Sequence, residues 1–278
     1  MQVSRRRLID SPKGLFMMTI HGPAVLDLNT QRDLFSAEGI YPVHQMEKHL
    51  DPLKKVFHWV KRQHVPVVST RLRNLTAPLP RSAGLTPGTP VRERLVGVPG
   101  TAGFDKLSNT TLRHRLEFPM DCETSLPVEG FRVHQQYIFD LPSLNLFDSP
   151  RLDQLLSESE VGLWIVVGGP LEWTLRTAVL GLLQRRHKVA VVSDALGQWD
   201  PYEGDMALRQ IESKNIEWLT AGQLVERFEK PKAVERPVAR VAARGPVQRA
   251  LAKAVRATSQ AKKRGAAKLK GKREFRAV

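Results

Sequence analysis

Residues 162–196 contain two apolar runs joined by a helical pattern, and this stretch limits the possible folds more than any other part of the chain. The first run, GLWIVVG, meets Gly-Gly-Pro, and the helical pattern of LEWTLRTAVLGLLQRRH starts at once. The second run, KVAVVSDAL, follows directly. Two strands with a crossover helix between them form a βαβ unit, so the stretch predicts a parallel sheet covered by helices.

The same alternation continues on both sides of this unit. The remaining strand candidates are residues 24–28, 65–70, 131–139 and 216–220, and the remaining helix candidates are 49–64, 149–158, 206–214 and 222–229. Strands alternating with helices of this length predict an α/β fold of three layers, α/β/α, with a mainly parallel sheet. Ligands of such sheets bind at the carboxyl ends of the strands, so we expect any small-molecule site to lie there.

The positive charge of the chain is concentrated near its C-terminal end. The net charge is +15, and residues 230–278 hold 16 Lys and Arg against two acidic residues, so the remainder is nearly neutral. We therefore expect an N-terminal extension at 1–14, one domain at 15–229 and a basic tail at 230–278. The composition of the tail predicts disorder when it is free. The tail is the candidate segment for binding nucleic acid or an acidic partner.

The rest of the composition excludes several classes of protein and site. The single cysteine, Cys122, excludes an intrachain disulfide and a cysteine-based metal cluster. No apolar run reaches the roughly 20 residues of a membrane helix, and no secretory signal pattern follows the basic N-terminus. We expect a cytoplasmic protein without a membrane segment. No Gly-rich phosphate motif or metal-ligand spacing occurs, so no cofactor and no metal are predicted.

Three stretches, taken in order, resemble the isochorismatase-like cysteine hydrolases, a superfamily that includes nicotinamidases, N-carbamoyl amidohydrolases and isochorismatases. Residues 24–39, AVLDLNTQRDLFSAEG, resemble the opening strand, which ends in an Asp followed by Gln/Asn-x-Asp-Phe. Residues 98–107, VPGTAGFDKL, resemble the Gly-Thr-Pro-Gly loop, and residues 164–197 resemble the nucleophile strand, turn and helix. The resemblance covers about residues 15–227 and implies a Rossmann-like fold and a homo-oligomer.

Members of the superfamily that hydrolyse amides use an Asp, a Lys and a Cys, and the helix N-terminus stabilises the thiolate. Carried over one position at a time, the Asp falls on Asp27, the Lys on Leu141 and the Cys on Thr174. A helix dipole worth about 1 kcal/mol cannot ionise a hydroxyl, and Leu141 offers no positive charge. The metal-binding Asp-x-His positions of nicotinamidases fall on Leu72 and Asn74, so the resemblance implies no metal.

These substitutions favour a catalytically degraded member of the superfamily, a pseudoenzyme that acts as a binding or scaffold protein. One alternative is an active hydrolase that uses Asp27 on a small amide or enol-ether substrate. In that case Thr174 is a candidate nucleophile and Leu141 marks a degenerate Lys position. A further alternative is a nucleic-acid-associated protein that binds through its basic tail. The sequence leaves all three open.

Overall fold

The computed structural model describes residues 18–76, 95–120, 125–127 and 130–229. The chain divides into one unit of Met1–Glu229 and a second of Lys230–Val278, and every described residue belongs to the first unit. The predicted N-terminal extension, the basic tail and Cys122 lie outside the described residues.

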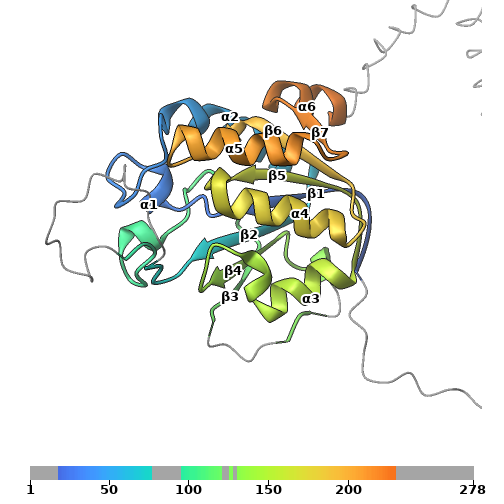
Figure 1. Cartoon of the computed structure of the whole chain (residues 1–278). Coiled ribbons are helices and arrows are strands. Elements are labelled where there is room, and N and C mark those ends of the chain that lie inside the picture. Colours follow the sequence, from blue (N-terminus) through green and yellow to red (C-terminus); the bar gives the residue numbers. More distant parts are fainter. Residues whose placement is uncertain (1–17, 77–94, 121–124, 128–129, 230–278) are drawn as a thin grey trace, which may run out of the picture. The chain divides into compact units, whose positions relative to one another are not determined.

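Seven parallel strands form one sheet in the order β3-β4-β2-β1-β5-β6-β7 (Figure 1). The strands are β1 (Met18–Leu28), β2 (Val67–Leu72), β3 (Arg115–Phe118), β4 (Gln136–Leu141), β5 (Ser159–Gly168), β6 (Val189–Leu196) and β7 (Glu217–Leu219). The parallel α/β fold predicted from the sequence is therefore confirmed. The central strands consist of near-continuous apolar runs because helices cover both faces of the sheet.

Two groups of helices form the outer layers (Figure 1). The helices are α1 (Arg32–Phe35), α2 (Glu47–Gln63), α3 (Pro150–Glu158), α4 (Arg176–Gln184), α5 (Pro201–Glu212) and α6 (Ala221–Phe228). Helix α2 packs against α6 and β6, whereas α4 packs against α5. We call these the α2 face and the α4 face of the sheet.

Local sequence signals explain where several helices begin. The side chain of Asp200 accepts hydrogen bonds from the backbone at the start of α5, and Pro201 occupies the first turn. Thr220 and Gln223 form a capping box at the start of α6. On α2, Val56 and Phe57 are among the residues that bury one side of the helix against the core, as its periodicity predicts.

The structure differs from the sequence-based expectation at the β3 edge of the sheet. Strand β3 was not predicted because RLEF is short and half of it is charged. The strand expected at 131–139 begins only at Gln136, and residues 130–132 form a 3-10 turn instead. The helix expected from residue 171 begins with a π-helical turn, Leu171–Leu175, before α4.

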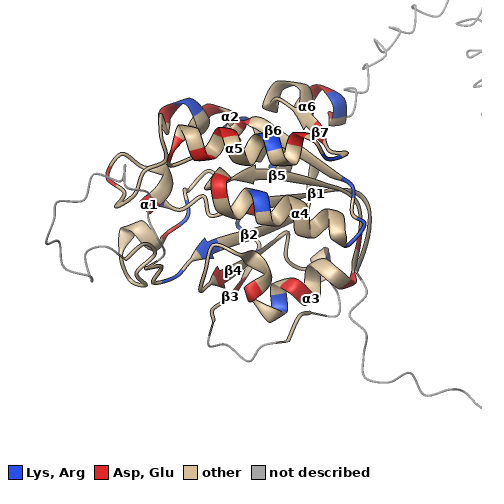
Figure 2. Cartoon of the chain, viewed as in Figure 1, with Lys and Arg blue, Asp and Glu red and all other residues tan. Residues whose placement is uncertain are grey.

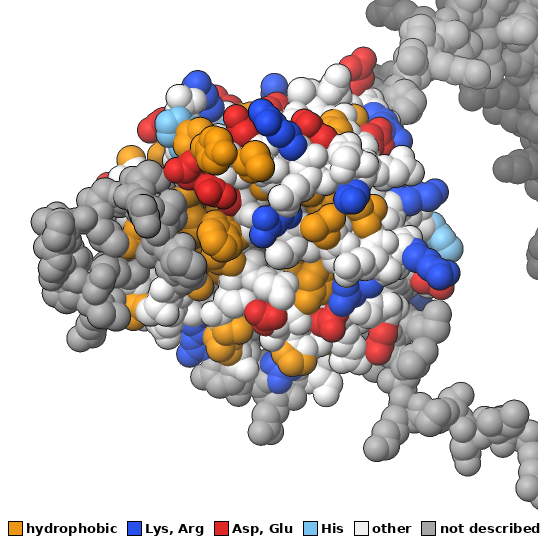
Figure 3. Space-filling view, in the orientation of Figure 1, with side chains coloured by type: hydrophobic (Ala, Val, Ile, Leu, Met, Phe, Trp, Pro, Cys, Tyr) orange, Lys and Arg blue, Asp and Glu red, His pale blue; other side chains and the backbone are white. Residues whose placement is uncertain are grey.

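Charge and exposed apolar side chains are dispersed over the described unit. Figure 2 shows Lys and Arg interspersed with Asp and Glu, in keeping with the nearly neutral balance outside the tail. Figure 3 shows hydrophobic side chains on the α4 face, and Tyr202 and Met206 of α5 are among the exposed large apolar residues of the chain.

Candidate functional site

Thr174 lies in the π-helical turn directly after the carboxyl end of β5, where the family resemblance places the nucleophile. Its Oγ1 accepts a hydrogen bond of 3.3 Å from Nδ2 of Asn29. The same Nδ2 donates to the Gly169 carbonyl at 3.0 Å, and Oδ1 of Asn29 accepts from Thr70 Oγ1 at 2.7 Å. Asn29, Thr70 and Thr174 are fully buried. We call these three residues the Asn29 cluster; it is neutral and closed to solvent.

Asp27 belongs to a different cluster. Its Oδ2 accepts a hydrogen bond of 2.7 Å from Ser69 Oγ and lies 2.9 Å from Lys106 Nζ. Its Oδ1 accepts from Thr30 Oγ1 at 2.8 Å. Among the described residues these are the partners of the carboxylate, and Thr174 is not one of them. Asp27 is fully buried, so all of its stabilisation comes from these groups.

The two clusters lie on opposite faces of the sheet. Asp27 pairs in register with Ser69, whereas Asn29 bonds to Thr70, the next residue of β2. Successive side chains of a strand alternate between faces, so Ser69 and Thr70 point in opposite directions. Asn29 follows β1 with a left-handed backbone, φ 48°, which Asn tolerates better than most residues. The left-handed conformation therefore turns the Asn29 side chain away from the face of the sheet on which strand alternation places Asp27.

This geometry does not bring Asp27, the predicted family carboxylate, into contact with Thr174, the predicted nucleophile position. In the family the carboxylate takes the thiol proton, so it must contact the nucleophile. The side chain that contacts Thr174 is that of Asn29, two residues after Asp27. Leu141, the predicted Lys position, is fully buried at the end of β4 and pairs in register with Leu72. Asn29, Leu141 and Thr174 carry no charge.

Lys106 is the site residue that sequence reasoning missed. It follows the loop that resembles the Gly-Thr-Pro-Gly motif, and Gln31 forms an isolated β-bridge with it. Its Nζ also donates to the Thr70 carbonyl at 3.2 Å. Burial lowers the pKa of Lys106, and the charge of Asp27 acts in the opposite direction. A buried carboxylate at a strand end calls for a cation, but nothing in the spacing identifies which one.

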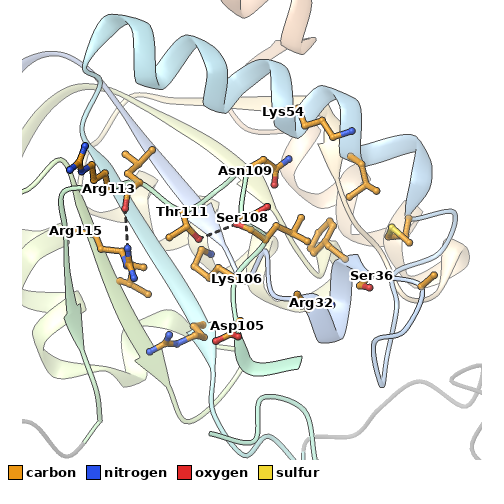
Figure 4. A pocket seen from close by; sticks show the side chains of 18 of the residues that line it. Arg32, Ser36, Lys54, Asp105, Lys106, Ser108, Asn109, Thr111, Arg113 and Arg115 are labelled. Carbon is orange, nitrogen blue, oxygen red and sulfur yellow. Dashed lines mark hydrogen bonds between the residues drawn. The ribbon is translucent and has the colours of Figure 1, made fainter. Parts of the chain in front are cut away.

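A cavity of about 1060 Å³ opens beside Lys106 on the α2 face, between α2 and the loop of residues 105–113 (Figure 4). In Figure 4, Lys106 lies near the centre, Arg113 and Arg115 lie to one side, and Arg32 lies to the other. We call this space the α2-side cavity. Its cationic lining residues are Arg32, Lys54, Arg71, Lys106, Arg113 and Arg115. Its acidic lining residues are Glu47, Asp105 and Glu117.

Arg71 anchors one wall of the α2-side cavity. Its guanidinium lies 2.7 Å from Asp140 Oδ1 and 3.2 Å from Glu117 Oε2, and it stacks over the ring of Phe104. Burial raises the pKa of Asp140, although Arg71 opposes this shift. For Glu117, burial favours the neutral form, but the hydrogen bonds and charges of Arg115 and Arg71 outweigh it and lower the pKa.

Glu172, two residues before Thr174, is another buried carboxylate. Its Oε1 accepts hydrogen bonds from the backbone N–H groups of Trp199 at 2.6 Å and Asp200 at 2.7 Å. Its Oε2 is buried and has no hydrogen-bond partner among the described residues. Burial raises the pKa of Glu172, and the two backbone donors only partly offset this. By contrast, Asp194 has a structural role, accepting from the Ala221 N–H at the start of α6.

Residues 23–223 match the model of the isochorismatase domain. The chain belongs to the isochorismatase domain family. A search of curated protein sequences found no match. No helix of the described part is long and apolar enough to cross a membrane. Nor do the described residues contain three or more His, Cys, Asp or Glu grouped to hold a metal ion.

Solved structures of the same family share the fold. A cysteine hydrolase from Pseudomonas syringae is 15% identical, with a TM-score of 0.52, and the match covers 81% of this chain and 99% of that one. A nicotinamidase/pyrazinamidase from Bacillus subtilis is 10% identical, with a TM-score of 0.52 and coverage of 71% and 99%. A zinc-bound pyrazinamidase from Pyrococcus horikoshii is 18% identical, with a TM-score of 0.50 and coverage of 71% and 98%.

Proposed function

We propose that this member of the isochorismatase family has lost the amide-hydrolysing triad and acts by binding rather than by catalysis. The observation that carries the proposal is the 3.3 Å hydrogen bond between Asn29 and Thr174, both fully buried. Under this proposal Asn29 stands where the chemistry requires a carboxylate, and Thr174 stands where it requires a thiol.

Each substitution removes one requirement of the reaction. An amide cannot take up a proton at neutral pH, so Asn29 cannot act as the general base for Thr174. Leu141 has no charge with which to support an anionic nucleophile or intermediate. Burial adds a further obstacle, because the Asn29 cluster has no exposed surface through which a substrate could reach Thr174.

The test is a turnover assay of the full-length protein on nicotinamide, pyrazinamide and an N-carbamoyl amino acid. We expect no hydrolysis above background. Thr174→Val, which removes the hydroxyl but keeps the side-chain volume, is the matched variant. Hydrolysis by the wild-type chain that disappears in Thr174→Val would show that the position still supplies a nucleophile, and the proposal would fail.

A second candidate function is favoured by one observation, the contact between Asp27 and Lys106. An acid with an adjacent cation beside a cavity suits proton transfer to a small amide or enol-ether substrate. Under this alternative Asp27→Asn abolishes a turnover that Thr174→Val leaves intact. The two variants therefore separate the two sites.

The remaining alternative, nucleic-acid or acidic-protein binding through residues 230–278, stays a prediction because the tail lies outside the described residues. A homo-oligomer and a cytoplasmic setting likewise remain proposals, which rest on family resemblance and on composition.

A further inference from the structure

We propose that the α2-side cavity is the binding site for a small organic anion, a phosphate monoester or carboxylate with an apolar body. The cavity is distinct from the Asn29 cluster, which lies on the other face of the sheet. It combines a volume of about 1060 Å³ with two kinds of lining side chain, and each kind specifies one part of the ligand.

The apolar lining specifies the body of the ligand. It is contributed by Phe35, Met46, Leu50, Leu107, Leu112 and Ile138. These side chains come from α1, α2 and the residue before it, β4 and the loop that carries Lys106. Small-molecule sites are typically concave and mostly apolar, with a few polar groups that orient the ligand. The volume of about 1060 Å³ slightly exceeds the usual range of about 300–1,000 Å³, so a ring with a charged substituent fits with room for water.

The charged lining specifies the sign of the ligand. Six cations line the cavity against three carboxylates, and four of the six are paired with carboxylates outside the lining, namely Asp27, Asp140, Asp51 and Glu38. Arg71 and Arg115 share one of these carboxylates, that of Glu117. Arg113 is exposed and has no hydrogen bond or ion pair to any described residue. An unpaired guanidinium that lines such a cavity favours a carboxylate or phosphate, whose oxygens it can bind in a bidentate arrangement.

Two further cations at the rim of the cavity, Arg32 and Lys54, are held only by exposed ion pairs. Arg32 lies 3.7 Å from Glu38, and Lys54 lies 2.9 Å from Asp51, in pairs whose side chains are all at least 45% exposed. Exposed pairs of this kind contribute little stability, so either cation can exchange its partner for a ligand at small cost. Lys106 is different, because its buried pair with Asp27 holds it in place at the floor. Arg113 and Arg32 lie on opposite sides of the cavity (Figure 4), and Arg113 is the unpaired one, so the charge-bearing end of the ligand belongs beside Arg113.

The proposal names the ligand site of the proposed binding function, and the two can fail separately. If the turnover assays detect hydrolysis while the anion still binds through Arg113, the loss of catalysis is refuted and the cavity assignment stands. If no turnover and no binding are found, the cavity assignment alone fails.

The experiment is calorimetric titration of the full-length protein with four probes at one ionic strength: phenyl phosphate, benzoate, benzyl alcohol and inorganic phosphate. We expect phenyl phosphate or benzoate to bind at least about tenfold more tightly than both of the other probes, because only they offer an apolar body and a charge together. The stronger of the two identifies phosphate or carboxylate as the preferred group.

Arg113→Gln tests the location. We expect it to weaken binding of the preferred probe by about tenfold or more, as for loss of a hydrogen bond to a charged group. The matched control is Arg209→Gln on α5, an exposed cation that does not line the cavity, and it should leave the affinity unchanged. Arg32→Gln is the second rim variant, and each folded variant is checked by its melting temperature.

Three results would overturn the proposal. The first is that neither phenyl phosphate nor benzoate binds at millimolar concentration. The second is a result that places binding elsewhere. The affinity for the preferred probe could be unchanged in both rim variants. Alternatively, it could equal the affinity for inorganic phosphate and be lost on deletion of residues 230–278, which would place binding on the tail. The third is a dimer in sedimentation that Arg113→Glu dissociates, with no probe bound, which would make this face an interface between two copies of the chain.

Discussion

Lys106 Nζ lies 2.9 Å from Asp27 Oδ2, and the two side chains are 2% and 0% exposed. The pair joins β1 to a loop that is distant in sequence, and the hydroxyls of Ser69 and Thr30 complete the coordination of the carboxylate. A buried charge that loses its partner is left without compensation. The ion pair therefore holds the loop that lines the α2-side cavity against the sheet.

We expect Lys106→Met to lower the free energy of unfolding by about 3–5 kcal/mol, because it leaves Asp27 buried and unpaired. The matched control is Lys54→Met, which removes an exposed pair with Asp51 and should cost less than about 1 kcal/mol. Urea denaturation of the two variants and the wild type measures both values. Equal costs would mean that the Lys106 pair is solvated in solution.

Because Asn29 contacts Thr174, we expect a charge introduced at position 29 to change the pKa of a thiol introduced at position 174. In a Cys122→Ser background, Thr174→Cys supplies a thiol beside Asn29. Adding Asn29→Asp places a carboxylate next to it, and we expect the apparent thiol pKa to rise because like charges disfavour the thiolate. The ultraviolet absorbance of the thiolate, followed as a function of pH, measures the shift without a reagent having to reach the buried position. Asn215→Asp, an exposed change of the same kind, should leave the thiol unchanged, and an equal response to both would contradict the assigned contact.

We expect the difference in free energy of unfolding between Glu172→Gln and the wild type to depend on pH. The pKa of Glu172 is raised above the ordinary 4.5 by burial, so the folded state holds the proton to a higher pH than the unfolded state does. The stabilisation from this group is complete below the unfolded pKa and is lost as pH rises through the folded pKa. Glu172→Gln does not titrate. Its free energy of unfolding should therefore rise relative to that of the wild type as pH increases from below 4.5 through the raised pKa.

Chemical denaturation of both proteins across this range checks the sign. The exposed Glu203→Gln on α5 is the matched control. If the difference between Glu172→Gln and wild type moves in the other direction as pH rises, the carboxyl is ionised and better solvated than its burial indicates.

Deletion of residues 230–278 should abolish polyanion binding and leave the melting temperature of the domain unchanged. The segment holds nearly all of the excess positive charge, and the seven-stranded unit ends before it. Binding by a cationic segment falls steeply with salt and depends little on sequence. Fluorescence anisotropy on a mixed-sequence duplex and an RNA of equal length, at two salt concentrations, measures this. Equal binding by the truncated chain would place the polyanion surface on the domain.

The sequence by itself determined the layers of the fold and the position of Thr174 in the turn after β5. Alternating apolar runs and helical patterns are local signals, and they predicted the parallel sheet and most of its strands. The turn after β5 places Thr174 at the start of a helix because Gly-Gly-Pro ends the strand there. Short, half-charged β3 carried no such signal, since pairing with β4, its strand neighbour in the described part of the chain, makes it a strand.

Only the tertiary structure decided which polar side chains meet. Asp27 and Asn29 are two residues apart at one strand end, and the sequence offers the carboxylate as the obvious partner for Thr174. The left-handed backbone at Asn29 instead turns the amide toward Thr70 and Thr174, while strand alternation directs Asp27 to the opposite face. Lys106 reaches Asp27 because the loop folds over β1, a contact between distant segments that no local pattern encodes.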